Sequence, residues 1–401
     1  MKVGIAGKEL EYLKGRVNES IDFMNSIGDD EVRRKIEYEV SQFAKGRSMS
    51  LSQKLALAKG VYNAIRGLDI LQPLVENDEI NEIMVNGYNN IFIERRGKIA
   101  RLNLGFESKE RLEAVIQKIV GGVNRVVNEA SPIVDARLQD GSRVNIVLAP
   151  LSIDGSVMTI RKFPKKALEI KDLLKIGAIS LEAVDFLHKL IYARYNIFIC
   201  GGTSSGKTTL LNALAGLIPE EERIITIEDS AELQIKGRQN IIRLETRNAN
   251  SEGRGEISMD ELIKTSLRMR PDRIIVGEVR GRECFSMLQA MNTGHDGSLS
   301  TGHANSPQDM ISRLEAMVLM TSQMPIEAVR RQIVSALEIM VHTTRLRDGR
   351  RQIVEISELV AKGNGAIQFN KIFSHKQGEL QYLGNKLEKI GKLEGYSNVE
   401  K

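Results

Sequence analysis

A glycine-rich stretch between a short apolar run and a run of helix-forming residues constrains this 401-residue chain more than any other feature. Residues 196–214 read NIFICGGTSSGKTTLLNAL. Residues 197–199 predict a buried strand and residues 210–214 predict a helix. Between them, residues 201–208 match the pattern Gly-x-x-x-x-Gly-Lys-Thr. A strand, such a loop and a helix in this order indicate an α/β domain with a phosphate-binding loop.

Each fixed residue type of this loop has a physical task in binding ATP together with Mg²⁺. Gly201, Gly202 and Gly206 are expected to let the backbone curl so that its N–H groups face an anion. The helix that starts near Lys207 adds the positive end of its dipole. We expect Lys207 at the β- and γ-phosphates and the Thr208 hydroxyl on Mg²⁺. The predicted nucleotide-binding residues are Gly201, Gly202, Thr203, Ser204, Ser205, Gly206, Lys207, Thr208 and Thr209.

Composition excludes several other classes of protein. The chain has no Trp and only 4% aromatic residues, which argues against a surface that stacks single-stranded bases. Two cysteines are too few for a disulfide framework or a cysteine zinc site. No uninterrupted apolar run is long enough to span a membrane, and no signal peptide is visible. The mild net charge of +5 permits weak attraction to an anionic membrane surface. We expect a cytosolic protein that is at most peripheral to a membrane.

The hydrophobic pattern divides the chain into five segments. They are an N-terminal helical segment (1–69), a small α+β domain (70–163), a linker (164–166), an α/β domain (167–361) and a polar C-terminal tail (362–401). In the α/β domain, strand patterns alternate with helix patterns, which predicts a mostly parallel sheet covered on both faces. Ligands then bind at the carboxyl ends of the strands, where the loop lies. The tail is expected to be loosely ordered, with room for a hairpin around Gln377 and Gly378.

The same pattern places the individual elements. Helices are predicted at 30–43, 50–65, 109–123, 180–195, 258–270, 281–292, 308–320 and 326–338. Strands are predicted at 79–87, 90–102, within 132–150, and at 155–163, 197–199, 223–228, 240–245, 272–278 and 297–301.

Two acidic strand ends are candidate catalytic positions. An apolar strand ends at Glu278, and an acid there can hold Mg²⁺ or its water. A second strand ends at Glu228 and Asp229, where a carboxylate can polarise the attacking water as a general base. The alternative is an ordinary strand end, or an acid at a helix N-terminus. The sequence leaves open which of Glu228 and Glu278 is the base.

Two further groups of residues have the chemistry to sense phosphate. His295 and His303 flank a short strand among glycines and hydroxyl residues, which suggests a phosphate-sensing loop rather than structural histidines. Arg137, Arg143 and Arg161 lie in strand patterns of the small domain and are expected on sheet edges. They can reach phosphate only if a domain or subunit closes over the loop, as arginine fingers do. The alternative is that they are ordinary surface charges.

Several motifs in one order resemble the type II/type IV secretion ATPase superfamily, and most closely the CpaF-type ATPases of tight-adherence (Flp) pilus machines. They are GGTSSGKTT, ITIEDSAEL, LETRNANSEGRGE, MRPDRIIVGEVRG and MNTGHDGSLSTGHANSP, with VNEASPIVDARLQDGSRVN and TIRKF in the first domain. The resemblance implies a RecA-like ATPase domain preceded by a PAS-like domain, in a homohexameric ring. It also implies ATP hydrolysis that drives pilus assembly or secretion at the cytoplasmic face of the inner membrane, on an integral-membrane platform protein.

The resemblance also implies roles for single residues. Lys207 and Thr208 fall in the Walker A motif, and Glu278 falls in an atypical Walker B motif. Glu228 falls in the aspartate box, where the family has its catalytic base, and His303 falls in the histidine box. Arg143 and Arg161 fall where the N-terminal domain supplies arginines to the phosphates.

The chain departs from the family pattern in a few places, and other functions stay open. Residue 204 is Ser where Gly is common, the cysteine-rich zinc insert of some relatives is absent, and the region before residue 70 is short. The alternatives are a conjugation-type (type IV) secretion ATPase, a nucleic-acid motor on the same core, and a slow regulatory nucleotide switch. Low aromatic content speaks against a direct nucleic-acid partner.

Overall fold

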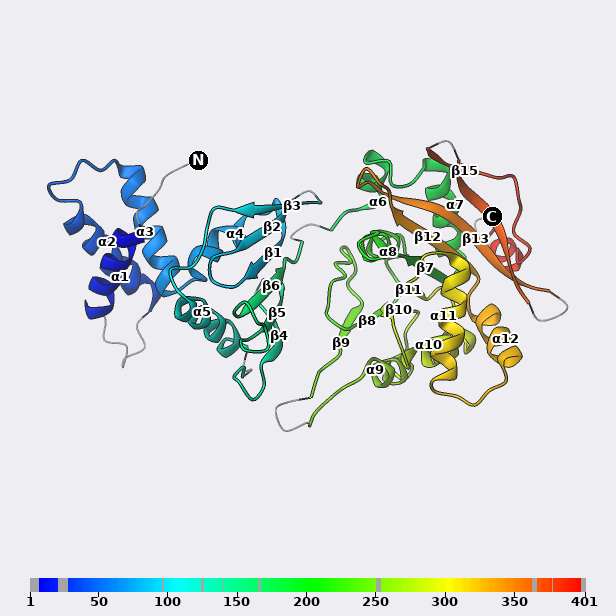
Figure 1. Cartoon of the computed structure of the whole chain (residues 1–401). Helices are drawn as coiled ribbons and strands as arrows, with labels where there is room; N and C mark the ends of the chain where they lie inside the picture. The colour runs from blue at the N-terminus through cyan, green and yellow to red at the C-terminus, as the bar shows by residue number, and fades with distance from the viewer. Residues whose placement is uncertain are drawn as a thin grey trace. The chain divides into compact units, whose positions relative to one another are not determined.

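Figure 1 shows the computed structural model of the chain, which forms two compact units, residues 1–165 and 166–401. Each unit is described by itself. The structure describes residues 7–20, 28–95, 97–123, 126–138, 140–164, 167–249, 254–362, 366–376 and 378–397. In these ranges, no helix combines the length and the apolar character that crossing a membrane requires.

The first unit begins with three packed helices. They are α1 (Gly7–Ser20), α2 (Asp29–Phe43) and α3 (Leu51–Ile65). Their buried side chains, among them Leu13, Ile36 and Val61, form a small core of their own. Helix α3 starts with a capping box in which the Ser50 and Gln53 side chains satisfy each other's backbone N–H groups. The two predicted helices are therefore present as α2 and α3, and α1 precedes them.

A six-stranded antiparallel sheet forms the rest of the first unit, in the order β3-β2-β1-β6-β5-β4. The elements are η1 (Asp69–Leu71), α4 (Gln72–Glu76), β1 (Ile80–Asn86), β2 (Ile91–Arg95), β3 (Lys98–Leu102), α5 (Lys109–Gly121), β4 (Ile133–Arg137), β5 (Arg143–Val147) and β6 (Val157–Arg161). Helix α5 packs on the sheet through residues such as Leu112 and Ile116. The single strand predicted at 90–102 is wrong: it splits into β2 and β3, because Gly97 turns the chain with φ +77°.

The second unit is built on a nine-stranded sheet of order β15-β14-β13-β12-β7-β11-β10-β8-β9. Its strands are β7 (Ile197–Gly201), β8 (Ile224–Glu228), β9 (Ile241–Glu245), β10 (Arg273–Val279), β11 (Leu299–His303), β12 (Ile339–Arg345), β13 (Arg351–Ala361), β14 (Ile367–Lys376) and β15 (Glu379–Tyr382). Its helices are α6 (Ile170–Lys175), α7 (Leu181–Tyr192), α8 (Lys207–Ala215), α9 (Met259–Ser266), α10 (Glu283–Asn292), α11 (Pro307–Leu319), α12 (Ile326–Ala336) and α13 (Gly391–Ser397). The strands from β12 to β9 in this order are parallel, and β13, β14 and β15 are antiparallel.

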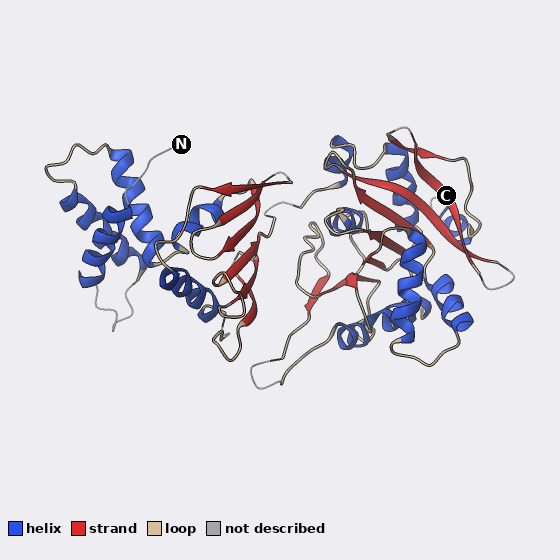
Figure 2. Ribbon diagram, viewed as in Figure 1, coloured by secondary structure: helices blue, strands red, loops and turns tan. Residues whose placement is uncertain are grey.

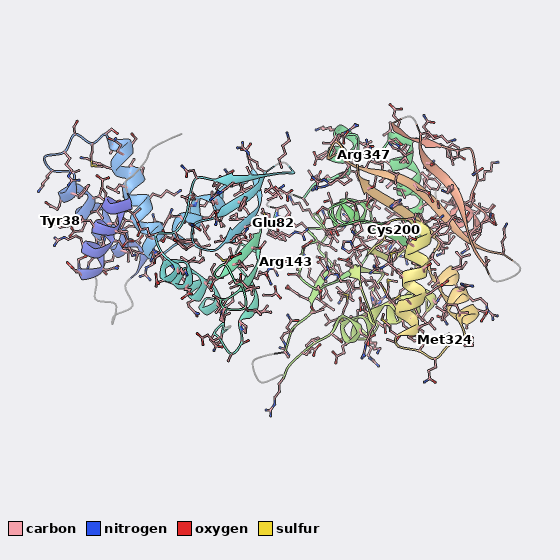
Figure 3. The ribbon with its side chains drawn as sticks, viewed as in Figure 1. Tyr38, Glu82, Arg143, Cys200, Met324 and Arg347 are labelled. Atoms are coloured by element: carbon pink, nitrogen blue, oxygen red, sulfur yellow. The ribbon has the colours of Figure 1, made fainter. Side chains whose placement is uncertain are left out.

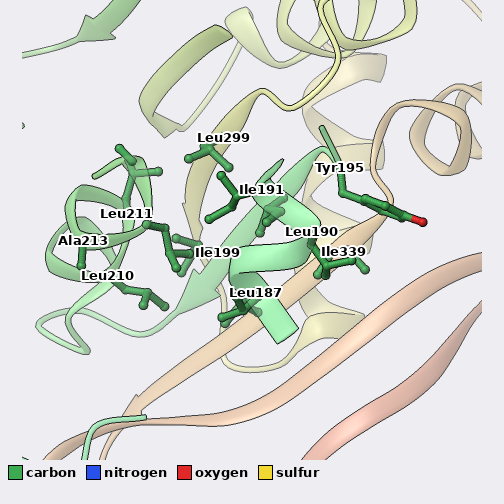
Figure 4. Close-up of a cluster of buried hydrophobic side chains, with 14 of the residues drawn as sticks. Leu187, Leu190, Ile191, Tyr195, Ile199, Leu210, Leu211, Ala213, Leu299 and Ile339 are labelled. Carbon is green, nitrogen blue, oxygen red and sulfur yellow. The ribbon is translucent and has the colours of Figure 1, made fainter. Parts of the chain in front are cut away.

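Helices cover both faces of the parallel part of this sheet (Figure 2). Alternate residues of β7 point to opposite sides. Ile197 and Ile199 pack with α7 and α8, as the close-up in Figure 4 shows for Ile199, and Phe198 and Cys200 pack with α9 to α12. The carboxyl ends of the parallel strands lie at one edge of the sheet, so the loop after β7 shares this edge with the ends of β8, β10 and β11.

The C-terminal part contains the predicted hairpin, since β14 and β15 pair antiparallel with Lys376 opposite Glu379, but it differs from the prediction in being ordered. Residues 362–401 were expected to form a loosely ordered polar tail outside the α/β domain. Strands β14 and β15 instead extend the sheet of that domain, and buried Phe373 of β14 joins its core. Strands β12 and β13 were not predicted either. Charged residues interrupt their apolar pattern, and β12 is buried beside β7, which is distant in sequence.

Candidate functional site

The loop between β7 and α8 is shaped by two residues in the left-handed conformation. Gly206, directly before the helix, has φ +96°, and Ser204 has φ +57°. Glycine adopts this conformation without steric cost, whereas a residue with a Cβ pays roughly 1–2 kcal/mol. Ser204, the residue that departs from the family pattern, therefore has the backbone conformation that glycine would favour.

Gly201 and Gly202 have different roles from those predicted, because neither has a positive φ. A Cβ built on Gly201 would lie 2.3 Å from the Thr343 carbonyl oxygen and 2.6 Å from Ser205 Oγ. A Cβ on Gly202 would meet no atom within 4 Å. Gly201 is thus required by the close approach of β12, and only Gly206 serves the curl of the backbone as expected.

Lys207, the first residue of α8, is buried and bridges the loop. Its ammonium donates to the carbonyl oxygens of Gly201 at 3.1 Å and Gly202 at 2.9 Å. It also lies 3.1 Å from Nδ1 of His303, at the end of β11. A lysine ammonium has only donors, so Nδ1 accepts this bond and the ring proton lies on Nε2. The structure therefore brings together the predicted Lys207 and His303.

His303 connects Lys207 to the acid at the end of β10. Its Nε2 lies 2.8 Å from Oε1 of Glu278, which matches a proton on that nitrogen. Burial lowers the pKa of His303, and neighbouring Glu278 raises it by a smaller amount. The imidazole is thus held neutral near physiological pH, between an ammonium on one side and a carboxylate on the other.

Arg280, which was not among the predicted residues, holds the other oxygen of this carboxylate. Its guanidinium donates to Glu278 Oε2 at 2.8 Å and lies 3.3 Å from Asp229 Oδ2, at the end of β8. The hydrogen bond that Arg280 donates to Glu278 raises the pKa of Arg280. Asp229 also accepts a hydrogen bond from the Thr246 hydroxyl at 3.1 Å. These contacts link the ends of β8, β10 and β11.

Glu228 is buried beside this chain of contacts and is held by backbone. Its Oε2 accepts hydrogen bonds from the N–H groups of Glu232 at 2.8 Å and Leu233 at 3.0 Å. A Cβ built on Gly277 of the neighbouring strand would lie 2.9 Å from Glu228 Cγ, so the glycine leaves room for this side chain. The Thr301 hydroxyl donates to the Gly277 carbonyl at 2.7 Å and fixes that stretch of β10.

His295 does not join the loop, contrary to the prediction. It precedes β11, whereas His303 is the last residue of that strand and pairs with Gly201 in the parallel register. The strand between them separates the two rings along its length. His295 Nδ1 lies 3.2 Å from the Ala290 carbonyl at the end of α10, which is a structural contact.

The metal-binding prediction rests on Thr208 and Glu278. In the described ranges, no group of three or more His, Cys, Asp or Glu side chains is arranged to hold a metal ion. Mg²⁺ in nucleotide sites commonly takes one or two protein oxygens together with phosphates and waters. Thr208 follows Lys207 on the first turn of α8, and Glu278 reaches Lys207 through His303. A hydroxyl and a carboxylate at this edge are oxygen donors of the type that Mg²⁺ prefers.

The predicted arginines lie next to one another in the first unit. Arg143, the first residue of β5, pairs directly with Arg137 at the end of β4 and with Arg161 at the end of β6. Arg161 in turn pairs with Glu82 of β1, and Figure 3 labels Glu82 and Arg143. Directly paired residues share one face of a sheet, and like charges there repel. β5 and β6 are interior strands, so Arg143 and Arg161 do not lie on the sheet edges where they were expected.

Comparison with known proteins gives a family. The profile of the family described as "Type II/IV secretion system protein" matches residues 65–392. A putative conjugal transfer protein of Mycobacterium tuberculosis is 32% identical over 333 residues, which cover 82% of this chain and 94% of that protein. The type IV secretion system protein PtlH of Bordetella pertussis is 33% identical over 317 residues, which cover 72% of this chain and 93% of that protein.

An uncharacterised protein of Methanocaldococcus jannaschii is 40% identical over 299 residues, and the matched part spans only 40% of that longer protein. Among solved structures, the Legionella pneumophila ATPase DotB superposes with a TM-score of 0.52 at 19% identity, covering 73% of this chain and 80% of that chain. The pilus retraction motor PilT with bound ADP superposes with a TM-score of 0.53 at 20% identity, covering 83% and 88%. These two likenesses concern the fold.

Proposed function

The chain belongs to the Type II/IV secretion system protein family, and we propose that it is the CpaF-type ATPase of a tight-adherence (Flp) pilus machine. The type II/type IV secretion ATPase superfamily predicted from the motifs is confirmed. The protein hydrolyses ATP, and the hydrolysis powers secretion or pilus assembly. The finer assignment to the Flp pilus rests on the motifs quoted above, which occur in one order along both domains.

The observation that carries the proposal is the contact chain Lys207–His303–Glu278 beside the phosphate loop. In this chain a cation, a neutral imidazole and a carboxylate meet where the γ-phosphate of ATP would lie. Lys207 would leave the loop carbonyls and bind the β- and γ-phosphates. The nitrogen of His303 that Lys207 releases carries no proton, so His303 would contact the γ-phosphate through it only after taking up a proton there. The bound nucleotide is thereby linked to Glu278 and, through Arg280, to the end of β8.

The residues present fit Mg²⁺, with Thr208 and Glu278 as the donors that would hold it, directly or through water. When bound, Mg²⁺ would neutralise part of the phosphate charge. We assign the general base to Glu228, because two backbone N–H groups hold its carboxylate at a fixed place near the strand ends. Glu278 is left to hold the ion or its water, because it lies at the end of β10 and is linked through His303 to Lys207 of the phosphate loop.

The arginine row of the first unit supports a catalytic role for that unit. Arg137, Arg143 and Arg161 are adjacent across three strands, so three guanidinium groups gather in one part of the sheet, with Glu82 paired to Arg161. Such a group of arginines can bind a triphosphate if the unit closes over a nucleotide site of the same chain or of a neighbouring subunit. We assign Arg143 and Arg161 the role of arginine fingers in a homohexameric ring. ATP binding then drives closure, and product release allows reopening.

The proposed place of work is the cytoplasmic face of the inner membrane. An integral-membrane platform protein of the pilus machine would receive the motion of the ring, and the chain would contact the membrane peripherally. We propose no direct contact with nucleic acid. The PAS-like character of the first unit also belongs to this proposal, on the resemblance of its motifs.

A conjugation-type (type IV) secretion ATPase is the second candidate. The observation that favours it is the identity above 30%, over most of the chain, with a putative conjugal transfer protein and with PtlH. Both candidates share the ATPase chemistry and differ in the membrane partner. ATP turnover by the purified chain should therefore be measured with the cytoplasmic part of a pilus platform protein, and separately with that of a conjugation machine. Stimulation of ATP turnover by the conjugation-machine protein alone would contradict the Flp assignment.

The closure mechanism has its own test in the full chain. Arg143→Ala and Arg161→Ala should each lower turnover strongly, because an arginine at the transition state can contribute about 10³–10⁵-fold in rate. Nucleotide affinity, measured by titration with a fluorescent ATP analogue, should change much less. Arg101→Ala, on exposed β3 of the same sheet, is the matched control and should turn over ATP normally. If the two variants lose no more turnover than the control, the arginines are surface charges.

A further inference from the structure

A hairpin far along the chain from the phosphate loop runs alongside it. It consists of β12, the turn at residues 346–350 and β13, and we call it the 339–361 hairpin. Strand β12 is the parallel neighbour of β7, with Thr343 opposite Gly201. Because β7 ends at Gly201 and β12 continues to Arg345, the hairpin extends past the sheet edge beside the loop. Figure 3 labels Arg347, which lies in its turn.

Thr343 of this hairpin holds the middle of the loop. Its hydroxyl lies 2.9 Å from the Ser205 hydroxyl and 3.4 Å from the Cys200 carbonyl, to which it donates. Ser205 is therefore the donor to Thr343 Oγ1. Ser205 is buried, and Gly201 packs directly against Thr343. The loop therefore contacts Thr343 of β12 at two places, Gly201 and Ser205.

Arg351, the first residue of β13, holds the next residue of the loop. Its Nε donates to the Ser204 carbonyl at 3.0 Å. Its Cδ and Cβ lie 3.5 and 3.7 Å from the position that a Cβ on Gly206 would take. Arg351 therefore spans the two loop residues in the left-handed conformation, Ser204 and Gly206.

Within the described ranges of the chain, the charge of Arg351 is not used in an ion pair. Of the nearby carboxylates, Asp348 pairs with Arg350 at 2.7 Å and Glu355 pairs with Lys371 at 2.6 Å. Across the residues that the structure describes, none lies within ion-pair distance of Arg351. Arg351 also pairs directly with Arg345 across the hairpin, and Arg351 itself is the cation that contacts the phosphate loop. An unneutralised cation in this place adds positive potential where a polyphosphate enters.

The loop needs such support because its phosphate-binding shape is unfavourable by itself. Ser204 carries a Cβ in the left-handed region, which is strained for any residue with a side chain. A loop that is already held in the bound shape loses less conformational entropy when the ligand binds. The hydrogen bond that Arg351 donates to the Ser204 carbonyl and the one that Ser205 donates to Thr343 hold the loop in this way.

We propose that Arg351 and Thr343 are positioning residues, which keep the phosphate loop in its nucleotide-binding shape before the nucleotide arrives. The proposal rests on nucleotide binding at this loop and on no choice of membrane partner. Its ligand is the polyphosphate part of the nucleotide, because the residues that are held, Ser204 and Ser205, belong to the loop motif that binds phosphate. The hairpin acts through the loop, so it affects affinity more than the chemical step.

The test compares variants of the full chain in binding to ADP and to inorganic tripolyphosphate, by competition with a fluorescent nucleotide. Arg351→Met keeps most of the side-chain stem and removes the donors. It should weaken both ligands by about tenfold, the loss expected for one charge-assisted hydrogen bond. Arg351→Lys should recover most of this loss, because an ammonium can donate to the same carbonyl. Thr343→Val should also weaken the binding of both ligands, and Thr343→Ser should bind them with the affinity of the wild type.

Arg347→Ala is the matched control, since it removes one arginine of the same hairpin and touches no described residue of the loop. It should bind both ligands within about twofold of the wild type. In steady state, Arg351→Met should raise KM for ATP and leave kcat within about twofold, a split that general destabilisation would not produce. The melting temperature of each variant identifies loss of fold.

Three results would overturn the proposal. One is unchanged affinity in Arg351→Met at an unchanged melting temperature. A second is weakened ADP binding with normal tripolyphosphate binding, which would place Arg351 at the nucleoside instead. The third is an equal loss in Arg347→Ala, which would indicate general electrostatics. A wild-type chain that failed to bind ADP at all would instead contradict the nucleotide site itself.

Discussion

Replacing Gly201 by alanine isolates the contact between the phosphate loop and β12. The added Cβ would lie 2.3 Å from the Thr343 carbonyl oxygen, and 2.6 Å from both Thr343 Oγ1 and Ser205 Oγ. Ordinary C···O contacts are about 3.3–3.6 Å, so the first overlap is roughly 1 Å. The closest atom belongs to the backbone of a central strand pair, and it cannot rotate away as a side-chain end can. Either β12 moves away from β7 or the loop shifts.

The cost follows from these contacts. Overpacking a well-packed site costs about 1–3 kcal/mol, and losing the Ser205–Thr343 hydrogen bond adds about 1 kcal/mol. For a unit of this size, each kcal/mol lowers the melting temperature by about 2–4 °C. Gly201→Ala should therefore melt about 4–16 °C below the wild type.

Gly202→Ala is the control, one residue away in the same loop. Its Cβ would meet no atom within 4 Å, and Gly202 does not have a positive φ. Its unfolding free energy should stay within about 0.5 kcal/mol of the wild type. The assay is thermal unfolding of the full chain without nucleotide, followed by circular dichroism. If Gly201→Ala melted at the wild-type temperature, or if both variants lost the same amount, the packing argument would be refuted.

The other predictions concern the chemistry of the site. Lys207→Ala should abolish hydrolysis and weaken nucleotide binding, because it removes the side-chain cation on the β- and γ-phosphates; undiminished phosphate release would contradict the site. Glu228→Gln should bind ATP without hydrolysing it, because the amide cannot act as a base. Glu278→Gln should slow turnover through the placement of Mg²⁺ or water. If Glu228→Gln turned over ATP normally and Glu278→Gln did not, the two roles would be exchanged. The His303 ring should titrate below pH 6.5 in an NMR titration assigned with His303→Gln, since burial lowers its pKa. Between the lowered pKa of His303 in the folded chain and its ordinary pKa in the unfolded chain, the unfolded chain then binds more protons than the folded chain. Folding stability should therefore fall as pH is lowered through that window, and a ring pKa at or above 6.5 would contradict the burial argument.

Local pattern was sufficient for much of the nucleotide site. The loop motif has fixed spacing, and β7 and α8 on either side follow from short-range hydrophobic periodicity. Glu228 and Glu278 were found because parallel strands bring their carboxyl ends to one edge, so an acid at a strand end has a predictable place. His303 was found for the same reason, at the end of β11.

Other features depended on which strands are neighbours, and periodicity carries no information on that. His295 and His303 look equivalent in the sequence, and only the direction of β11 separates them. The direct pairing of Arg143 with Arg137 and Arg161 is a consequence of strand register. Register is set by how whole faces of a sheet pack, because a slip of one residue turns every side chain to the other face.

The sequence by itself therefore determined the family, the phosphate loop and the acids and histidine around it, because these depend on residue types at short, fixed spacings. Only the tertiary structure decided what holds the loop. Thr343 and Arg351 lie more than a hundred residues beyond Ser205 and Ser204 along the chain. They meet the loop because β12 pairs with β7 and β13 returns beside it, a placement determined by burial of the shared sheet and not by any local pattern.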